Sequence, residues 1–173
     1  FPVLMLISGR QDQFLEMEWQ NFAGLAASVI TGVGAGDVFL FRAMRSVGVV
    51  RSYTIGGTFP LFGLVFAVAF LGEHVGATAI AGTLLVVAGG AFVTARSSAE
   101  LRVPVIAKWA YRRGLALSLL VAMMWGADLV FLKIGVGDAD PVVANSFRMP
   151  FAAMVMSLAA WRIHGEIPVL RVS

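Results

Sequence analysis

Residues 114–136 have the sequence GLALSLLVAMMWGADLVFLKIGV, an apolar run that only Asp128 and Lys133 interrupt. A helix needs roughly 20 apolar residues to cross the hydrocarbon core of a bilayer, so this run is long enough to span a membrane. Further apolar runs of similar length lie at 22–41, 53–71, 76–95 and 142–161. A soluble domain of 173 residues has no interior that can hide five such helices. The sequence therefore predicts an all-α fold, a polytopic helical bundle in the lipid bilayer.

The composition agrees with a membrane protein and excludes several kinds of site. Hydrophobic residues make up 59% of the chain and charged residues only 13%, against about a quarter in soluble domains. There is no cysteine, hence no disulfide, thiolate metal site or thiol nucleophile. Neither histidines with carboxylates at metal-ligand spacing nor a phosphate-binding loop is present. We expect no catalytic residue, no metal and no cofactor.

The basic residues are distributed unevenly between alternate loops. The connections 10–21, 72–75 and 137–141 contain a single Lys or Arg, whereas those on the other side, together with the last residues, contain ten. Such a bias normally marks the cytoplasmic face. We therefore expect a multi-pass protein of the plasma or inner membrane with loops 42–52 and 96–113 in the cytoplasm. The basic loops are topology determinants and predict no nucleic-acid partner.

Four ionisable residues lie inside the predicted spans, and each costs roughly 2.5 to 3.5 kcal/mol at the centre of a helix. Asp128 is at least roughly 12 Å from the nearer end of its helix and shares a face with Trp125. Arg148 lies near the depth of Lys133. For Asp128 and Arg148 we favour a role in lining a cavity. For Lys133 we favour structural pairing, and for Asp37 interface anchoring or pairing with a nearby arginine, with a pathway role as the alternative for both.

Two prolines interrupt predicted spans. Pro60 follows Gly56 and Gly57, and Pro150 lies in the last span. Because proline has no N–H, each leaves one helical carbonyl without its usual donor, and the helix kinks or opens there. Exposed backbone at membrane depth is tolerated only against protein or a watery cavity. The four residues are candidate helix-break or hinge positions beside a cavity, with kinks that merely shape the bundle as the alternative.

Small residues recur at intervals of four in two spans. One stripe contains Gly24, Ser28, Gly32 and Gly36, and the other contains Gly114, Ser118, Ala122 and Gly126. In lipid, small residues allow helix backbones to approach closely and gain van der Waals contact. Both stripes therefore predict helix packing, which is also what two sliding surfaces of a transporter require.

Several short motifs, in this order, resemble a known family. Residues 59–62 (FPLF), 70–73 (FLGE), 80–82 (IAG) and 88–90 (AGG) resemble the end of an EamA-type repeat. Gly36-Asp37, Ala43 and Val47-Gly48 resemble the part before it. Trp125-Gly126, Lys133, Asp140-Pro141 and Arg148 resemble the opening of a second repeat. The chain is thus similar to EamA-like transporters of the drug/metabolite transporter superfamily.

The resemblance implies a ten-helix bundle made of two inverted five-helix repeats around a central cavity. Residues 1–95 would be the end of the first repeat, 96–113 a basic connection, and 114–173 the start of the second. We expect the chain to be an internal piece of a longer protein. Members with both termini in the cytoplasm would have loop 96–113 outside, whereas the charge count places it inside.

The predicted function is that of a secondary transporter, or permease, which moves a small metabolite, an amino-acid-like solute or a drug by alternating access. Protons are a candidate coupling ion and a homodimer is a candidate assembly. The candidates for the solute and ion pathway are charged or aromatic residues of the spans, namely Asp37, Tyr53, Phe59, Trp125, Asp128, Lys133 and Arg148. The alternatives are an intramembrane lipid-modifying enzyme and a non-transporting scaffold subunit.

Overall fold

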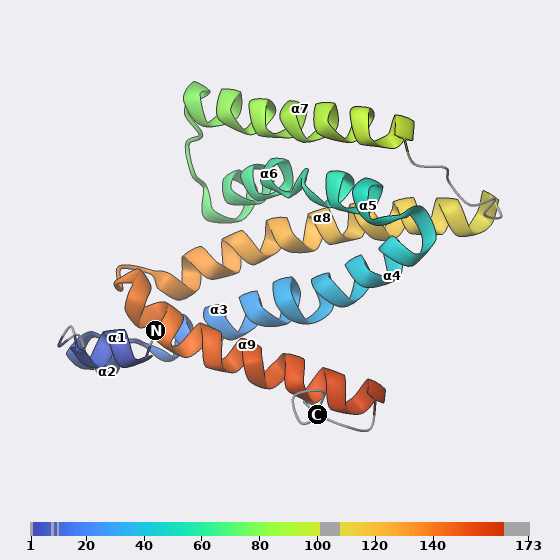
Figure 1. The fold of residues 1–173 in the computed structure, drawn as a ribbon. Coiled ribbons are helices and arrows are strands. Elements are labelled where there is room, and N and C mark those ends of the chain that lie inside the picture. The colour runs from blue at the N-terminus through green and yellow to red at the C-terminus, as the bar shows by residue number, and fades with distance from the viewer. Residues whose placement is uncertain (1, 8, 10, 101–107, 165–173) are drawn as a thin grey trace. The chain divides into compact units, whose positions relative to one another are not determined.

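The chain folds into helices joined by short connections. A computed structural model describes residues 2–7, 9, 11–100 and 108–164, and every regular element among them is helical (Figure 1). Four helical segments are long and apolar enough to cross a membrane: Trp19–Val47, Val49–Leu71, Lys108–Val136 and Pro141–Arg162. The predicted all-α, multi-pass membrane fold is confirmed.

The span predicted at 76–95 differs from the other four. It forms α7 (Ala77–Glu100), whose described apolar part, Ala77–Phe92, is shorter than those four segments. The polar connection predicted at 96–113 is also shorter than expected, because α7 continues to Glu100 and α8 begins at Lys108. Polar residues end an apolar span without ending a helix, since several are good helix formers. Residues 101–107 lie outside the described part.

The chain divides into two compact units. Unit 1 contains Phe1–Gly34 and Phe131–Ser173, and unit 2 contains Ala35–Val130. The chain passes from one unit to the other inside two helical elements, the π-helix η1 (Ile30–Gly36) and α8 (Lys108–Val136).

Unit 1 is built around α9 (Pro141–His164). This helix packs against α1 (Pro2–Ile7), α2 (Gln11–Glu16) and α3 (Trp19–Val29). Leu25, Val29, Val143 and Ala144 are buried in its core. Asp140 caps α9, because its Oδ1 accepts the backbone N–H of Val142 at 2.8 Å, and Pro141 occupies the first helical position, where a missing N–H costs nothing.

In unit 1, the backbones of α3 and the end of α8 approach each other closely at Gly24 and Gly135. A Cβ added to Gly24 would lie 2.8 Å from the Cα of Gly135, and one added to Gly135 would lie 2.5 Å from the backbone nitrogen of Leu25. Any side chain at either position would force the two backbones apart. Gly24 of the first small-residue stripe therefore packs as the sequence predicts.

Unit 2 contains α4 (Asp37–Val47), α5 (Val49–Gly56), α6 (Phe59–Leu71), α7 and the first part of α8. α5 packs against α4 and α7, and α6 also packs against α7. Gly48 separates α4 from α5 with a φ of 86°, in the left-handed region that favours glycine. Leu40, Ala43, Val47 and Val121 are among its buried residues.

The helix that contains Pro60 is interrupted. α5 ends at Gly56 and α6 begins at Phe59, so Pro60 falls in the first turn of α6. The backbone N–H of Gly57 donates to the carbonyl of Tyr53 at 2.7 Å, which closes α5. Proline is tolerated in a first helical turn, where its N–H would have no helical acceptor. In contrast, α9 continues through Pro150.

All members of both small-residue stripes are buried. In unit 2, a Cβ added to Gly114 would lie 2.6 Å from Cγ1 of Val47, and one added to Gly126 would lie 2.6 Å from Cβ of Phe62.

The first stripe runs through the π-helix η1, whose wider turns were not predicted from the sequence. A four-residue repeat drifts around an α-helix of 3.6 residues per turn, and a π segment, with more residues per turn, offsets that drift.

The packing at Gly126 makes a prediction about stability. Gly126→Ala should lower the free energy of unfolding by about 1–3 kcal/mol, because the new Cβ overpacks against Phe62 and the backbone of Gly63. The thermal midpoint of the purified full-length protein in detergent measures this. Gly82→Ala is the matched control, because nothing lies within 4 Å of a Cβ there. Equal midpoints for the two variants would contradict the close approach of α6 and α8.

Candidate functional site

The indole of Trp125 in α8 is the centre of a polar and aromatic cluster in unit 2. The side chains of Trp125 and Asp37 are hydrogen-bonded. Because an indole can only donate, the Asp37 carboxylate is the acceptor. The ring of Phe59 meets the Trp125 ring edge-on, with 5.9 Å between centroids. We call Asp37, Gly56, Phe59, Trp125 and Asp128 the Trp125 cluster.

Gly56 positions the Trp125 indole by close packing. A Cβ added to Gly56 would lie 3.4 Å from Cζ3 of Trp125, so the ring packs on the glycine backbone. This contact is at the last residue of α5, directly before the interruption at Gly57 and Thr58. The Trp125 cluster therefore adjoins an interrupted helix.

Asp128 brings a second carboxylate to the cluster. It lies three residues after Trp125, on the same face of α8, and its charge acts on that of Asp37. Two like charges at membrane depth repel each other more strongly than they would in water. The interpretation favoured for Asp37 from the sequence, interface anchoring or pairing with a nearby arginine, stays a prediction. Arg42 lies over the ring of Phe39, 5.8 Å from its centroid.

In unit 1, a second ionisable residue of the spans has a polar partner: Arg148 of α9 contacts Ser28 of α3. Nε of Arg148 donates to Oγ of Ser28 at 3.1 Å, and the Ser28 hydroxyl donates to the carbonyl of Leu25 at 2.9 Å. Ser28 is fully buried and Arg148 half-buried. This contact joins residues that are far apart in the sequence and fixes one edge of the guanidinium.

Aromatic rings accompany this contact along α9. The Phe147 ring stacks on Phe151, with 5.6 Å between centroids, and meets the Phe22 ring edge-on at 5.2 Å. Phe22 in turn meets Phe14 edge-on at 5.5 Å. These rings hold α9 against α3 and α2. They therefore support the backbone on both sides of the Arg148–Ser28 contact.

The seven predicted pathway residues are divided between the units. Unit 2 contains Asp37, Tyr53, Phe59, Trp125 and Asp128, whereas unit 1 contains Lys133 and Arg148. The structure joins Asp37, Phe59 and Trp125 through contacts, while Tyr53 is 50% exposed on α5. Lys133 is exposed on α8. Sequence analysis assigned Ser28 only to packing, because a serine in a small-residue stripe carries no sign of a distant arginine.

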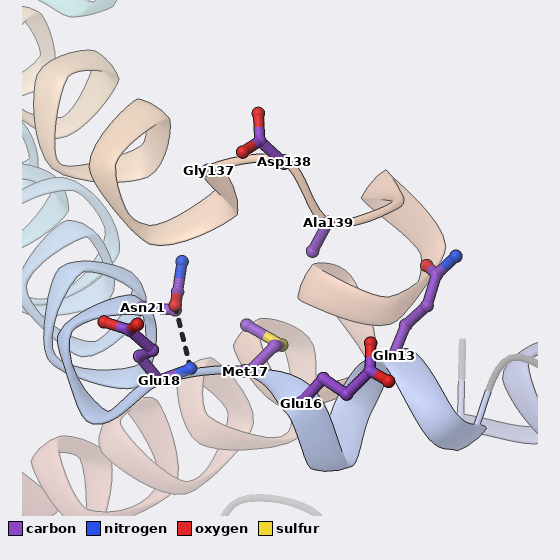
Figure 2. A pocket seen from close by; sticks show the side chains of 8 residues that line it. All are labelled: Gln13, Glu16, Met17, Glu18, Asn21, Gly137, Asp138 and Ala139. Atoms are coloured by element: carbon purple, nitrogen blue, oxygen red, sulfur yellow. Dashed lines mark hydrogen bonds between the residues drawn. The ribbon is translucent and has the colours of Figure 1, made fainter.

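A pocket of about 430 Å³ lies in unit 1 (Figure 2). Its volume is in the range of roughly 300–1,000 Å³ that small-molecule sites occupy. Its lining comes from α2, the start of α3 and the turn after α8, namely Gln13, Glu16, Met17, Glu18, Asn21, Gly137, Asp138 and Ala139. Figure 2 shows Asn21 accepting the backbone N–H of Glu18, at 3.0 Å, which fixes the start of α3. No sequence pattern predicts this pocket.

No group of three or more histidine, cysteine or acidic residues among the described residues is arranged to hold a metal ion. The side chains of the predicted pathway residues offer groups for binding: carboxylates for a proton or cation, a guanidinium for an anion, and aromatic faces for apolar or cationic groups.

Comparison with known proteins identifies one family. The sequence model of the EamA-like transporter family matches residues 1–95, more than half of the chain. No curated protein and no solved structure has significant similarity to the chain.

The hydrogen bond between Trp125 and Asp37 leads to a prediction about stability. Trp125→Phe should lower the free energy of unfolding by about 1–3 kcal/mol, because Asp37 loses a donor while the aromatic ring is kept. A thermal melt of the purified full-length protein measures the change. Trp109→Phe is the control, because Trp109 is 70% exposed on the same helix. A Trp125→Phe protein as stable as the control would contradict the importance of the bond.

Proposed function

The chain belongs to the EamA-like transporter family, and from this we propose that it is part of a secondary transporter that moves a small metabolite, an amino-acid-like solute or a drug by alternating access. Members of that family are membrane transporters. The observation that carries the proposal for this chain is the Trp125 cluster, in which two carboxylates and two aromatic rings of the spans gather beside an interrupted helix. The family match favours transport over the lipid-modifying enzyme and the scaffold subunit.

We assign the pathway residues by their chemistry. Asp128 holds a proton or contacts the solute, and its like-charged neighbour Asp37 supports protons as the coupling ion, because binding one proton relieves the repulsion between them. Phe59 and Trp125 form an apolar wall of the pathway, and we place Tyr53 on the same wall. Arg148 and Lys133 attract anionic groups.

The interruption after Gly56 supports a moving part. Transporters bind solutes where discontinuous helices expose backbone groups towards a cavity. Pro60 has no N–H and cannot donate to the carbonyl of Gly56, so α5 and α6 are joined by fewer backbone bonds than a continuous helix has. We propose that Gly56, Gly57 and Pro60 form a hinge. We propose Pro150 as a second flexible point, because its missing N–H removes one backbone bond inside the continuous helix α9.

For the arrangement of the whole protein we propose two inverted repeats of five helices. The first would end at residue 95, where the family match also ends, and the second would begin at residue 114. The basic residues of loops 42–52 and 96–113 support a cytoplasmic location for both.

Transport by the full-length protein tests the pathway residues. Asp128→Asn and Arg148→Ala should each reduce the initial rate of solute movement at least about tenfold, because each removes the charged form that the mechanism uses. Arg113→Ala is a matched control, since Arg113 is exposed and lies over the Trp109 ring, 5.4 Å from its centroid. Unchanged rates for Asp128→Asn and Arg148→Ala, at equal amounts of protein in the membrane, would disprove the assignment.

Labelling of an introduced cysteine tests the orientation. The chain has no cysteine of its own, so a Ser98→Cys variant carries one thiol in this region. That thiol should react with a membrane-impermeant reagent only after the cells are permeabilised, whereas Asp138→Cys should react in intact cells. Labelling of Ser98→Cys in intact cells would place loop 96–113 outside.

A further inference from the structure

Three cationic side chains gather around one aromatic ring in unit 2. The guanidinium of Arg51, near the start of α5, lies over the ring of Tyr111 in the first turn of α8, 5.9 Å from its centroid. Lys108 and Arg112 are exposed on α8 and, because they are four residues apart, are neighbours on the helix surface next to Tyr111. We call Arg51, Lys108, Tyr111 and Arg112 the basic site.

Backbone packing brings the helices of the basic site together (Figure 1). A Cβ added to Gly114 would lie 2.7 Å from Cβ of Ser46, so the first part of α8 packs directly on the end of α4. Gly48 then turns the chain into α5, which begins at Val49 and brings Arg51 to the ring of Tyr111. The meeting of cations from α5 and α8 is therefore a product of the fold.

The charges of the basic site repel one another. Like charges four residues apart destabilise a helix, and α5 adds a third cation. No Asp or Glu occurs at 38–72 or at 101–127, the parts of the chain around these cations. The ring of Tyr111 has no net charge, so it holds the guanidinium of Arg51 and leaves the positive charge in place. Membrane topology depends on how many basic residues lie near a span and does not require that they meet, so their meeting indicates an anion.

The basic site lies at the ends of two spans. Arg51 is the third residue of the span Val49–Leu71, and the other three residues are among the first five of Lys108–Val136. Tyrosine and tryptophan are enriched where spans meet the lipid headgroups, and Trp109, which is 70% exposed, occurs in the same turn as Tyr111. Long basic side chains keep their charged ends at this level. The basic site is thus placed at the depth of the headgroups.

An exposed apolar face continues from the basic site along α8. Leu119 and Met123 follow Arg112 by seven and eleven residues, which places all three on one side of a helix with 3.6 residues per turn. Leu119 is 47% exposed and Met123 is 41% exposed. Positive charge at the end of a span, next to an exposed apolar face, matches an amphiphile with an anionic headgroup better than it matches a soluble anion.

We propose that the basic site binds an anionic phospholipid, whose phosphate lies among Arg51, Lys108 and Arg112 and whose acyl chain lies along Leu119 and Met123. The bound headgroup relieves the repulsion among the three cations and links α5 to α8. This binding is separate from the proposed solute pathway and does not depend on which solute is transported.

Native mass spectrometry of the purified full-length protein tests which lipid binds. Phosphatidylglycerol, which is anionic, and phosphatidylcholine, which is zwitterionic, are titrated separately with the same acyl chains. The ionic strength is about 0.15 M, at which exposed charges more than roughly 8 Å apart are largely screened. Phosphatidylglycerol should bind at least about tenfold more tightly, and glycerol phosphate at the same concentration should not displace it. Equal affinity for the two lipids, or displacement by glycerol phosphate, would overturn the proposal.

Single substitutions test the position of the site. Arg112→Gln and Arg51→Gln should each weaken the binding of phosphatidylglycerol about fivefold, which is the contribution of one basic residue close to an anionic lipid surface. Arg113→Gln is the matched control, because it removes the same charge from the next residue of α8. Arg113 lies about 100° further round the helix, over the ring of Trp109 at 5.4 Å from its centroid, so this variant should change the affinity less than about twofold.

The variants distinguish a site from a general effect of charge. Equal weakening by Arg112→Gln and Arg113→Gln would mean that the lipid responds only to the net charge of this region, and the proposal would be wrong. An Arg51→Gln protein that binds as tightly as the wild type would also disprove it, because α5 would then not take part. If Arg112→Gln does not reach the membrane, Lys108→Gln replaces it with the same expected weakening, since Lys108 is exposed on the same side of α8.

Discussion

The hydrocarbon core of a bilayer cannot solvate a polar group, and this constraint governs the polar contacts inside the spans. A charged side chain there needs a polar partner from the protein, or a route to water. The structure meets this need for Asp37 through Trp125 and for Arg148 through Ser28. In both contacts an ionisable group is held by a neutral donor or acceptor. Such a partner orients the ionisable group by a hydrogen bond.

Small residues make this arrangement possible. The indole of Trp125 packs on the backbone of Gly56, and Ser28 reaches Arg148 because α3 and α9 lie against each other. In unit 1, Gly24 and Gly135 also allow α3 and α8 to approach closely. In membranes, where helices gain no hydrophobic free energy from association, such close approach supplies van der Waals contact. The same glycines and serines therefore serve packing and, in two places, position a charged or aromatic side chain.

The sequence predicts the parts of this protein that depend on local pattern. The length of the apolar runs locates four spans. Pro60 locates the interruption before Phe59, and the small residues at intervals of four locate the buried stripes. Partners that are distant in the sequence could not be predicted this way. Nothing near Asp37 points to Trp125, and nothing near Ser28 points to Arg148, because tertiary packing alone brings them together. The π-helix η1 was also missed, since no feature of its local sequence distinguishes a π-helix from an α-helix.

Polarity alone misplaced the ends of two helices. α7 runs past the end of its apolar residues, and α8 begins before its own, because a helix and a membrane span end for different physical reasons. The backbone hydrogen bonds of a helix form with polar or apolar side chains, whereas insertion into lipid requires apolar side chains. Loop lengths inferred from hydropathy are therefore upper bounds.

We infer that this chain belongs to a protein that moves a small solute across a membrane. Comparative metabolite profiling of medium and cytosol, from cells that express the full-length reading frame and from cells with an empty vector, tests it most directly. At least one small metabolite should change its distribution between cytosol and medium when the protein is present. If expression in the membrane is verified and the distribution of every metabolite is unchanged, the account of this protein as a metabolite transporter is contradicted.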